Sequence, residues 1–367
     1  MQTAREKKII KTSVIGIIVN VMLVGFKMAV GLLANSIAII LDAVNNLSDA
    51  LSSLITIIGT KLASKAPDKK HPFGHGRIEY ITSIIISVIV LLAGFTSIKE
   101  SIEKIINPEA TNYSIYSIIV ISAAIITKFI IGKYVKGVGV KLNSQSLIAS
   151  GSDAFFDAVL SFATLVGAVI NMIWGLQLEG ILGVAISVII IKAGVEMLGE
   201  SLSSIIGRRA DSETTDKIKE LIGAYDEVNG VYDLTLHNYG PTKIIGTVHV
   251  EVDDNMTARE IHDLTRKITE DIFVEFNIIL TVGIYASNSS AETERFKEIV
   301  NTEIKKHPEV IQMHGLYIDE KRKLVSFDII VEFKQNAQKI RGEIIEALKK
   351  ELPGYEIYII LDTDFSE

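Results

Sequence analysis

The sequence predicts a membrane bundle of six transmembrane α-helices followed by two small α+β domains in tandem. The first observation is hydropathy: 48% of the 367 residues are hydrophobic and the mean hydropathy is +0.36, which is unusual for a soluble protein. The second is charge, since residues 1–206 hold 17 basic and 13 acidic side chains, while residues 207–367 hold 20 and 31. The third is an αββαβ pattern that occurs twice in the acidic part. The chain therefore combines an apolar, slightly basic part with an acidic, water-soluble part.

The composition also excludes several classes of function. The chain has no cysteine, which excludes a disulfide scaffold, thiolate catalysis and a cysteine-ligated zinc or iron–sulfur site. The acidic second part argues against nucleic acid as a partner, because phosphate backbones attract basic surfaces. No HExxH motif or comparable catalytic constellation is evident, so we expect a protein that is not an enzyme.

Six apolar stretches are long enough to cross a bilayer, which requires about 20 helical residues. They are predicted at Ile9–Leu33, Ser36–Leu62, Arg77–Ile106, Tyr113–Tyr134, Ser144–Ile173 and Leu178–Ile206. The first follows four basic residues, as a signal peptide does, but its apolar run is far longer than the roughly 7–15 residues of a signal peptide. We therefore expect it to be retained as a span.

Basic residues alternate between the connections, and this alternation predicts the orientation of the spans. The basic segments are the N-terminus, the connections after spans two and four, and the segment after span six; they contain Arg5, Lys7, Lys8, Lys11, Lys65, Lys69, Lys70, Arg77, Lys133, Lys136, Lys141, Arg208 and Arg209. The connections near residues 34–35, 107–113 and 174–177 contain no Lys or Arg. We therefore expect both termini in the cytoplasm and the spans in the cell (plasma) membrane.

Two predicted spans carry pairs of oxygen-bearing side chains. Asn45 and Asp49 are four residues apart in span two, and Asp153 and Asp157 are four apart in span five. Four residues return to nearly the same face of a helix, so each pair presents two oxygen ligands in one direction. A carboxylate at mid-helix costs roughly 2.5–3.5 kcal/mol to insert, so such residues are usually functional. If spans two and five pack together, the four side chains predict a divalent-cation site.

A competing interpretation is that these polar residues only form hydrogen bonds between spans. It accounts for four further residues of span two, Asn46, Ser48, Ser52 and Ser53. It does not account for three acids at matched spacing, because hydrogen bonding between spans needs no net charge.

Other charged residues of the spans are given lesser roles. Asp42 lies seven residues before Asp49, hence on nearly the same face, and is expected to act beside the site as an acceptor, a proton relay or an entrance charge. Four isolated lysines are expected to extend their side chains to the membrane interface: Lys27, Lys61, Lys128 and Lys192.

A second candidate metal site lies in the connection between spans two and three. This segment reads Pro-Asp-Lys-Lys-His-Pro-Phe-Gly-His-Gly-Arg at residues 67–77 and contains Asp68, His71 and His75. Two imidazoles and a carboxylate within eight residues are able to form a small metal site. The alternative is a solvated loop with incidental histidines.

The acidic part predicts two copies of one α/β unit, each of about 75 residues. The first copy is predicted from helices at Thr214–Ala224 and Thr257–Glu275 and strands at Gly230–Leu236, Ile244–Val252 and Ile278–Ile284. The second is predicted from helices at Glu292–Lys306 and Ala337–Leu352 and strands at Ile311–Ile318, Leu324–Phe333 and Ile357–Leu361. The expected domains are therefore residues 1–208, 209–287 and 291–367, with a polar linker near residues 286–290.

These motifs together resemble the cation diffusion facilitator family of divalent-metal transporters. The resemblance rests on SIAIILDAVNNLSD at residues 36–49, on the HPFGHG loop at residues 71–76 and on SDAFFD at residues 152–157, and it covers about residues 8–286. It implies a homodimer with a tetrahedral transport site between spans two and five, a cytoplasmic ferredoxin-like domain and proton-coupled export by alternating access. The second cytoplasmic copy departs from the family pattern.

Matched position by position, the resemblance assigns the transport ligands to Asn45, Asp49, Asp153 and Asp157 and the loop site to Asp68, His71 and His75. In the first cytoplasmic copy, His249 and His262 match positions that bind regulatory metal in many members, although scattered surface histidines often bind nothing.

Selectivity is predicted from the donor atoms. Zinc exporters of the family normally include a histidine among the four transport ligands, whereas here all four are oxygen donors, as in the manganese-type branch. Oxygen ligands suit Mn²⁺, so we predict Mn²⁺ export in exchange for protons, with Fe²⁺ and Zn²⁺ as lesser candidates. A membrane-anchored metal sensor without flux is the alternative of another class.

Overall fold

The computed structural model describes residues 2–33, 37–107, 115–174, 178–287 and 291–363. These residues form two compact units. The first comprises Met1–Arg208 together with the turn Asn238–Lys243, and the second comprises Arg209–His237 and Ile244–Glu367. The predicted span limits Ser36 and Tyr113, and most of the lysine-free connections, lie outside the described residues.

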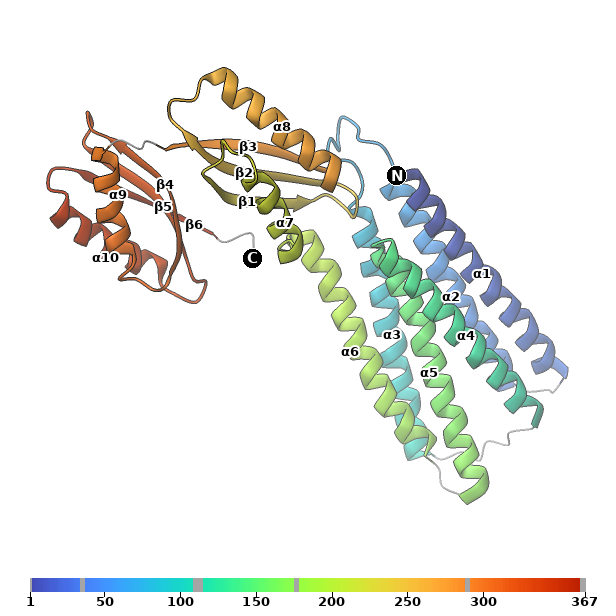
Figure 1. The fold of residues 1–367 in the computed structure, drawn as a ribbon. Helices are drawn as coiled ribbons and strands as arrows, with labels where there is room; N and C mark the ends of the chain where they lie inside the picture. The colour runs from blue at the N-terminus through green and yellow to red at the C-terminus, as the bar shows by residue number, and fades with distance from the viewer. Residues whose placement is uncertain (1, 34–36, 108–114, 175–177, 288–290, 364–367) are drawn as a thin grey trace. The chain divides into compact units, whose positions relative to one another are not determined.

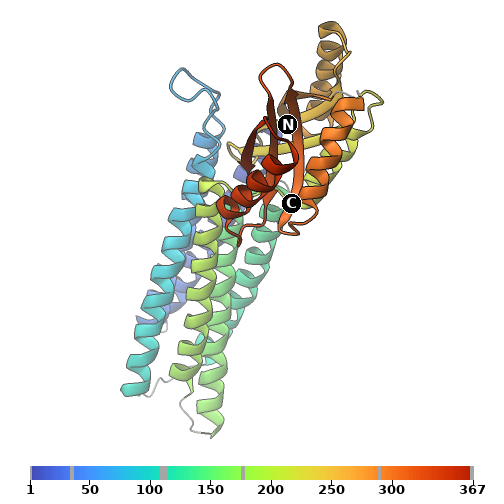
Figure 2. The same ribbon diagram turned by 90° about the vertical axis from the view of Figure 1, so that its left-hand side faces the viewer.

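The first unit is a bundle of long helices that run side by side in both views (Figures 1 and 2). The helices are α1 Gln2–Leu33, α2 Ile37–Ala63, α3 Ile78–Ile106, α4 Ile115–Lys141, α5 Gln145–Trp174 and α6 Glu179–Ile206. The closest pairs are α1 with α2, α3 with α6 and α4 with α5. Among the described residues, three segments are long and apolar enough to cross a membrane: Ala4–Val30, Ile78–Ile106 and Gly180–Ile206. The count of six spans stays a prediction.

The bundle places small and polar side chains inside and large apolar side chains outside. The buried face of α3 consists mainly of small or polar residues, including Thr82, Ser83, Ser87, Gly94, Ser97 and Ser101. Ser187 Oγ donates to Ser97 Oγ at 2.8 Å and Ser201 Oγ donates to Ser83 Oγ at 2.9 Å, which joins α6 to α3. The exposed residues include Met22, Leu92 and Ile130. This distribution is typical of helices that pack within lipid, where small residues let backbones approach.

Arg5 joins three parts of the chain at one end of the bundle. Its guanidinium donates to both carboxylate oxygens of Glu79, at the start of α3, at 3.0 Å. It also donates to the backbone oxygens of Leu142, at 2.8 Å, and Asn143, at 3.0 Å, which follow α4. The N-terminus, the start of α3 and the end of α4 therefore lie at the same end of the bundle. This is expected, because two helices separate each of these points from the next.

The second unit contains the order αββαβ twice. The first copy comprises α7 Ser212–Gly223, β1 Gly230–Asn238, β2 Ile244–Asp253, α8 Ala258–Phe276 and β3 Ile278–Ser287. The second comprises α9 Ala291–Ile304, β4 Val310–Asp319, β5 Leu324–Val331, α10 Ala337–Glu351 and β6 Glu356–Asp362. These bounds agree with the sequence-based expectations to within a few residues. The strands form two separate sheets, ordered β1-β2-β3 and β4-β5-β6.

Each sheet has one face covered by its own helices. In the first copy Val248, Val250 and Val252 pack against α7 and α8, and in the second Val325, Phe327 and Ile329 pack against α9 and α10. The pairings β2 with β3 and β5 with β6 are parallel, because α8 and α10 cross over between them. Alternation along the strands then places His249 and Asp328 on the faces that the helices leave open.

Candidate metal sites

The first candidate site lies between α2 and α5, which contact each other. Asp49 of α2 and Asp153 of α5 are buried, and Asp157, one turn after Asp153, has a side chain that is 28% exposed. Ser52 Oγ donates a hydrogen bond of 3.3 Å to Asp153 Oδ2, which links the two helices at the acids. Asn45 lies on α2 as expected, but its side chain, like that of Asp42, lies outside the described part of the structure.

Lys128 of α4 completes this site, and its expected extension to the membrane interface is wrong. Its Nζ lies 2.8 Å from Asp49 Oδ2 and 2.8 Å from Asp157 Oδ2, and its side chain is only 4% exposed. A buried ammonium is costly unless it is paired, and here two carboxylates pair with it. Asp49 Oδ2 and Asp157 Oδ2 each lie 2.8 Å from Lys128 Nζ, so the two oxygens are separated by at most twice 2.8 Å.

The remaining isolated lysines behave differently from one another. Lys27 is also buried, contrary to expectation, whereas Lys61 and Lys192 are exposed. Lys192 lies 3.8 Å from Glu196 on the same helix. A lone charge inside a span is by itself a reason to expect a partner, and that signal was present for Lys128 in the sequence.

Asn46 does not fit the interpretation of hydrogen bonding between spans. Its side chain is fully buried, and neither its amide nitrogen nor its amide oxygen has a hydrogen-bond partner among the described residues. Unsatisfied buried amides are rare in native structures. Asn46 precedes Asp49 by three residues, so spacing alone was enough to place it beside the acids.

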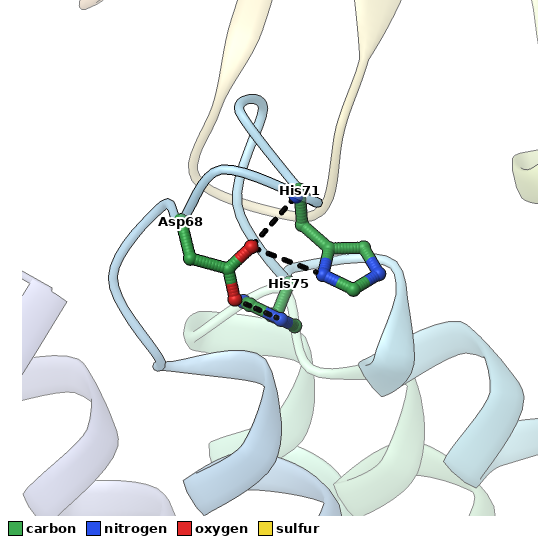
Figure 3. Close-up of side chains that lie close together, drawn as sticks. All are labelled: Asp68, His71 and His75. Carbon is green, nitrogen blue, oxygen red and sulfur yellow. Dashed lines mark hydrogen bonds and ion pairs between the residues drawn. The ribbon is translucent and has the colours of Figure 1, made fainter.

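The loop residues Asp68, His71 and His75 form a second cluster, and Figure 3 shows both imidazoles turned toward the carboxylate. Asp68 Oδ1 lies 3.3 Å from His71 Nδ1, and Asp68 Oδ2 lies 3.6 Å from His75 Nε2. One potential ligand atom from each residue fits within 4.8 Å of the others. Two imidazoles and a carboxylate at this spacing are able to bind a divalent cation.

The shape of the loop is set by Asp68. Its Oδ1 accepts hydrogen bonds from the backbone N–H groups of Lys70 at 2.8 Å and His71 at 2.7 Å. These bonds, first of all that from His71, hold the pKa of Asp68 below its usual range. Gly74 supports the turn with a φ of +87°, a conformation that favours glycine. The carboxylate is therefore ionised and oriented before any cation arrives.

The two histidines expected to bind metal in the cytoplasmic part are not brought together. His262 is exposed on α8, whereas His249 of β2 places its Nδ1 2.8 Å from Asp233 Oδ2. The hydrogen bond to Asp233 raises the pKa of His249 above its ordinary value. Asp233 was not identified from the sequence, because its role depends on a strand pairing that spacing does not show.

Comparison with known families identifies both parts of the chain. The cation efflux transmembrane domain matches residues 13–206, and the cytoplasmic domain of cation efflux proteins matches residues 210–284. The second match ends within β3, so the α9–β6 copy follows the matched region.

Several known proteins are similar to this chain. An uncharacterized transporter of Methanocaldococcus jannaschii, MJ0449, is 32% identical over 258 residues, which is 70% of this chain and 91% of the relative. The manganese efflux system protein MneP of Bacillus subtilis is 26% identical over 78% of this chain and 98% of its own length. The cation-efflux pump FieF of Cronobacter sakazakii is 24% identical over 66% of this chain and 80% of its own.

Proposed function

Because the chain belongs to the cation diffusion facilitator family of membrane transporters, we propose that it exports Mn²⁺ from the cytoplasm in exchange for protons. The observation that carries this proposal is the acidic site between α2 and α5. All of its proposed protein donors are oxygen atoms, which Mn²⁺ accepts more readily than Zn²⁺ does. The similarity to MneP, a protein named for manganese efflux, supports the same cation.

In the proposed site, Asn45, Asp49, Asp153 and Asp157 bind the cation, and Asp42 acts nearby. Without cargo, Lys128 neutralises one of the three negative charges through its contacts with Asp49 and Asp157. Mn²⁺ then displaces the ammonium from the carboxylate oxygens, because both cations need the same lone pairs. Protons compete for those oxygens too, which couples their entry to metal release.

The proposed architecture follows the family. Six spans, with both termini in the cytoplasm and the protein in the plasma membrane, form the transport domain at residues 1–208. Residues 209–287 form a ferredoxin-like cytoplasmic domain, and residues 291–367 form a second copy. We propose a homodimer in which the spans of each protomer move between inward-open and outward-open states. The cluster of Asp68, His71 and His75 binds a further cation close to the transport domain.

Flux through reconstituted vesicles tests the transport site. Wild-type protein is expected to move Mn²⁺ saturably and to dissipate an imposed pH gradient. Asp49→Asn and Asp157→Asn, which keep side-chain size but remove a charged ligand, are expected to lower flux at least a hundredfold. Asp216→Asn, at an exposed position on α7, is the matched control and is expected to transport normally.

The same assay separates the competing functions. Undiminished flux in both Asp variants would contradict the proposed ligands. Binding of Mn²⁺ without any flux would instead favour the membrane-anchored sensor.

Selectivity is tested by adding a nitrogen donor. Asn45→His is expected to shift the ratio of Zn²⁺ to Mn²⁺ flux toward zinc by about tenfold, because imidazole suits Zn²⁺. The measurement is flux of both cations in the same vesicles, and His262→Asn, at an exposed surface histidine, controls for general effects. An unchanged ratio would count against donor type as the basis of selectivity.

A further inference from the structure

The open faces of the two cytoplasmic sheets contribute side chains to one cluster. Asp233 of β1, His249 of β2 and Tyr285 of β3 come from the first copy. His314 of β4, Asp328 of β5 and Asp362 of β6 come from the second. All six lie in the second compact unit.

His314 is the centre of this cluster. Its side chain is fully buried, and its Nε2 lies 2.8 Å from Asp233 Oδ1, 3.9 Å from Asp328 Oδ2 and 3.9 Å from Asp362 Oδ2. Ligand atoms about 2.1 Å from a tetrahedral cation lie about 3.4 Å from one another. One ligand atom from each of Asp233, His314 and Asp328 lies within 4.8 Å of the others, which suits a shared ion.

Three atoms of the cluster lack the hydrogen bonds that burial demands. Neither ring nitrogen of His314 has a hydrogen-bond partner among the described residues, and neither has Asp233 Oδ1. Nε2 and Oδ1 lie 2.8 Å apart as an ion-pair contact, without a hydrogen bond between them. An unsatisfied buried group of this kind requires a partner.

The groups around the ligands are placed as supporting contacts. Asp233 uses its other oxygen, Oδ2, for His249 Nδ1 at 2.8 Å and for Tyr285 Oη at 2.9 Å. Tyr285 Oη also lies 3.1 Å from Asp328 Oδ2. Hydrogen bonds from neighbouring groups orient carboxylate ligands in metal sites in this way. Asp233 Oδ1 is thereby left for a cation.

The backbone also aims the ligands. Asp233 has a φ of +54°, and Gly315, directly after His314, has a φ of +64°. The pairing of β4 with β5 shifts between His314 and Tyr317, which marks a bulge. Bulges redirect side chains out of the regular alternation of a strand. The ring of Tyr232 stacks on His314 with centroids 5.2 Å apart and fixes its plane.

We propose that a divalent transition-metal cation binds between the two cytoplasmic copies, held by Asp233 of the first and by His314 and Asp328 of the second, with Asp362 beside them. Three carboxylates and a neutral imidazole gather negative charge that a divalent cation offsets. The mixed nitrogen and oxygen donors accept Mn²⁺, Fe²⁺ or Zn²⁺. Because two of the three ligands belong to the second copy and one to the first, the site joins the two copies.

The alternative is a metal-free ion pair in which His314 is protonated and bound to the aspartates. The two interpretations differ for Asp328→Asn, a substitution that keeps the size of the side chain. In the metal site it removes an anionic ligand and abolishes the response to metal. In the ion-pair cluster no response to metal exists in either protein.

The proposal is tested by energy transfer between two fluorescent labels, one on each cytoplasmic copy. Because the chain has no native cysteine, two introduced cysteines are the only labelling sites. Lys267→Cys on α8 and Lys349→Cys on α10, both exposed positions, are labelled with a fluorescent donor and acceptor in the full chain. Labelled protein is mixed with excess unlabelled protein so that energy transfer reports distances within one chain. The background carries Asp49→Asn and Asp157→Asn to suppress binding in the membrane. Mn²⁺ or Zn²⁺ is then added.

A saturable change in energy transfer is expected in the background protein and in the control His262→Gln. Asp328→Asn and His314→Gln are each expected to abolish that change and to lower the Mn²⁺ bound, counted by electron paramagnetic resonance, by one ion per chain. Energy transfer that does not respond to metal in the background protein overturns the proposal. A response that is retained in Asp328→Asn overturns it equally.

Discussion

Lys128 places a positive charge between carboxylates that are proposed to bind the exported cation. Its Nζ contacts Asp49 and Asp157, each at 2.8 Å, so it takes the position that cargo needs. An internal cation of this kind weakens the binding of an external one, because part of the binding energy goes into separating the existing ion pairs. At this scale the lysine is expected to lower the affinity of the proposed site for its cargo.

Replacing Lys128 tests this competition. Lys128→Gln is expected to tighten Mn²⁺ binding about tenfold, a change of about 1.4 kcal/mol, and to slow turnover because release becomes harder. The measurement is Mn²⁺ binding in detergent together with KM and kcat for flux in vesicles. Lys192→Gln, at an exposed position, is the control. Weaker binding in Lys128→Gln would show that the lysine supports the cation rather than competing with it.

At the residue scale, the sequence predicted which acids of one helix lie on the same face. Spacing of four residues predicted that Asp153 and Asp157 share a face, since that property belongs to one helix. It did not predict that Lys128 meets Asp157, because this contact depends on how α4 packs against α5. The sequence also did not group Asp233 with His314 and Asp328. Asp233 lies on the first sheet and the other two lie on the second, so their contact depends on how the two sheets pack.

At the scale of elements, the packing of α4 on α5 holds Lys128 against the acids, and glycines in this contact permit it, Gly151 with the closest approach. A Cβ on Gly151 of α5 meets the backbone nitrogen of Lys136 at 2.4 Å, closer than real atoms approach. Helices in membranes use small residues for such close contacts. The strands, by contrast, were predictable from their alternation, although the bulge after His314 was not.

Gly151→Ala is therefore expected to push α4 away from α5. Overpacking of this kind costs about 1–3 kcal/mol, and we expect a lower Tm together with reduced Mn²⁺ flux. The control is Gly137→Ala on α4, where a Cβ meets nothing within 4 Å. Thermal unfolding in detergent and vesicle flux measure the two effects. Equal behaviour of the two variants would mean that the close contact does not hold the site.

At the scale of the whole molecule, hydropathy and charge predicted a membrane part and a soluble part, and family comparison identifies both. The contacts of Arg5 with Glu79 and Asn143 place the predicted cytoplasmic ends together. Residue composition predicts this division because lipid selects apolar residues and water selects polar and charged ones along the chain. Composition does not predict how the two tandem copies contact each other, because that contact is made by individual side chains.

The predicted topology is testable in the chain without native cysteine. Lys69→Cys in the loop and Glu346→Cys on α10 are expected to react with a membrane-impermeant maleimide only after cells are permeabilised, because both positions are assigned to the cytoplasm. Asn107→Cys, at the end of α3, is expected to react in intact cells. All three positions are exposed in the structure. Labelling of Lys69→Cys from outside would reverse the orientation.

The ion pairs of Lys128 also bear on how the protein is made. A newly synthesised chain enters the bilayer before it has acquired any metal, and carboxylates inside lipid are costly without a counter-charge. Because Lys128 reaches Asp49 and Asp157 from another helix of the same chain, assembly supplies that counter-charge internally. Assembly of the bundle therefore does not require a bound metal to offset these charges.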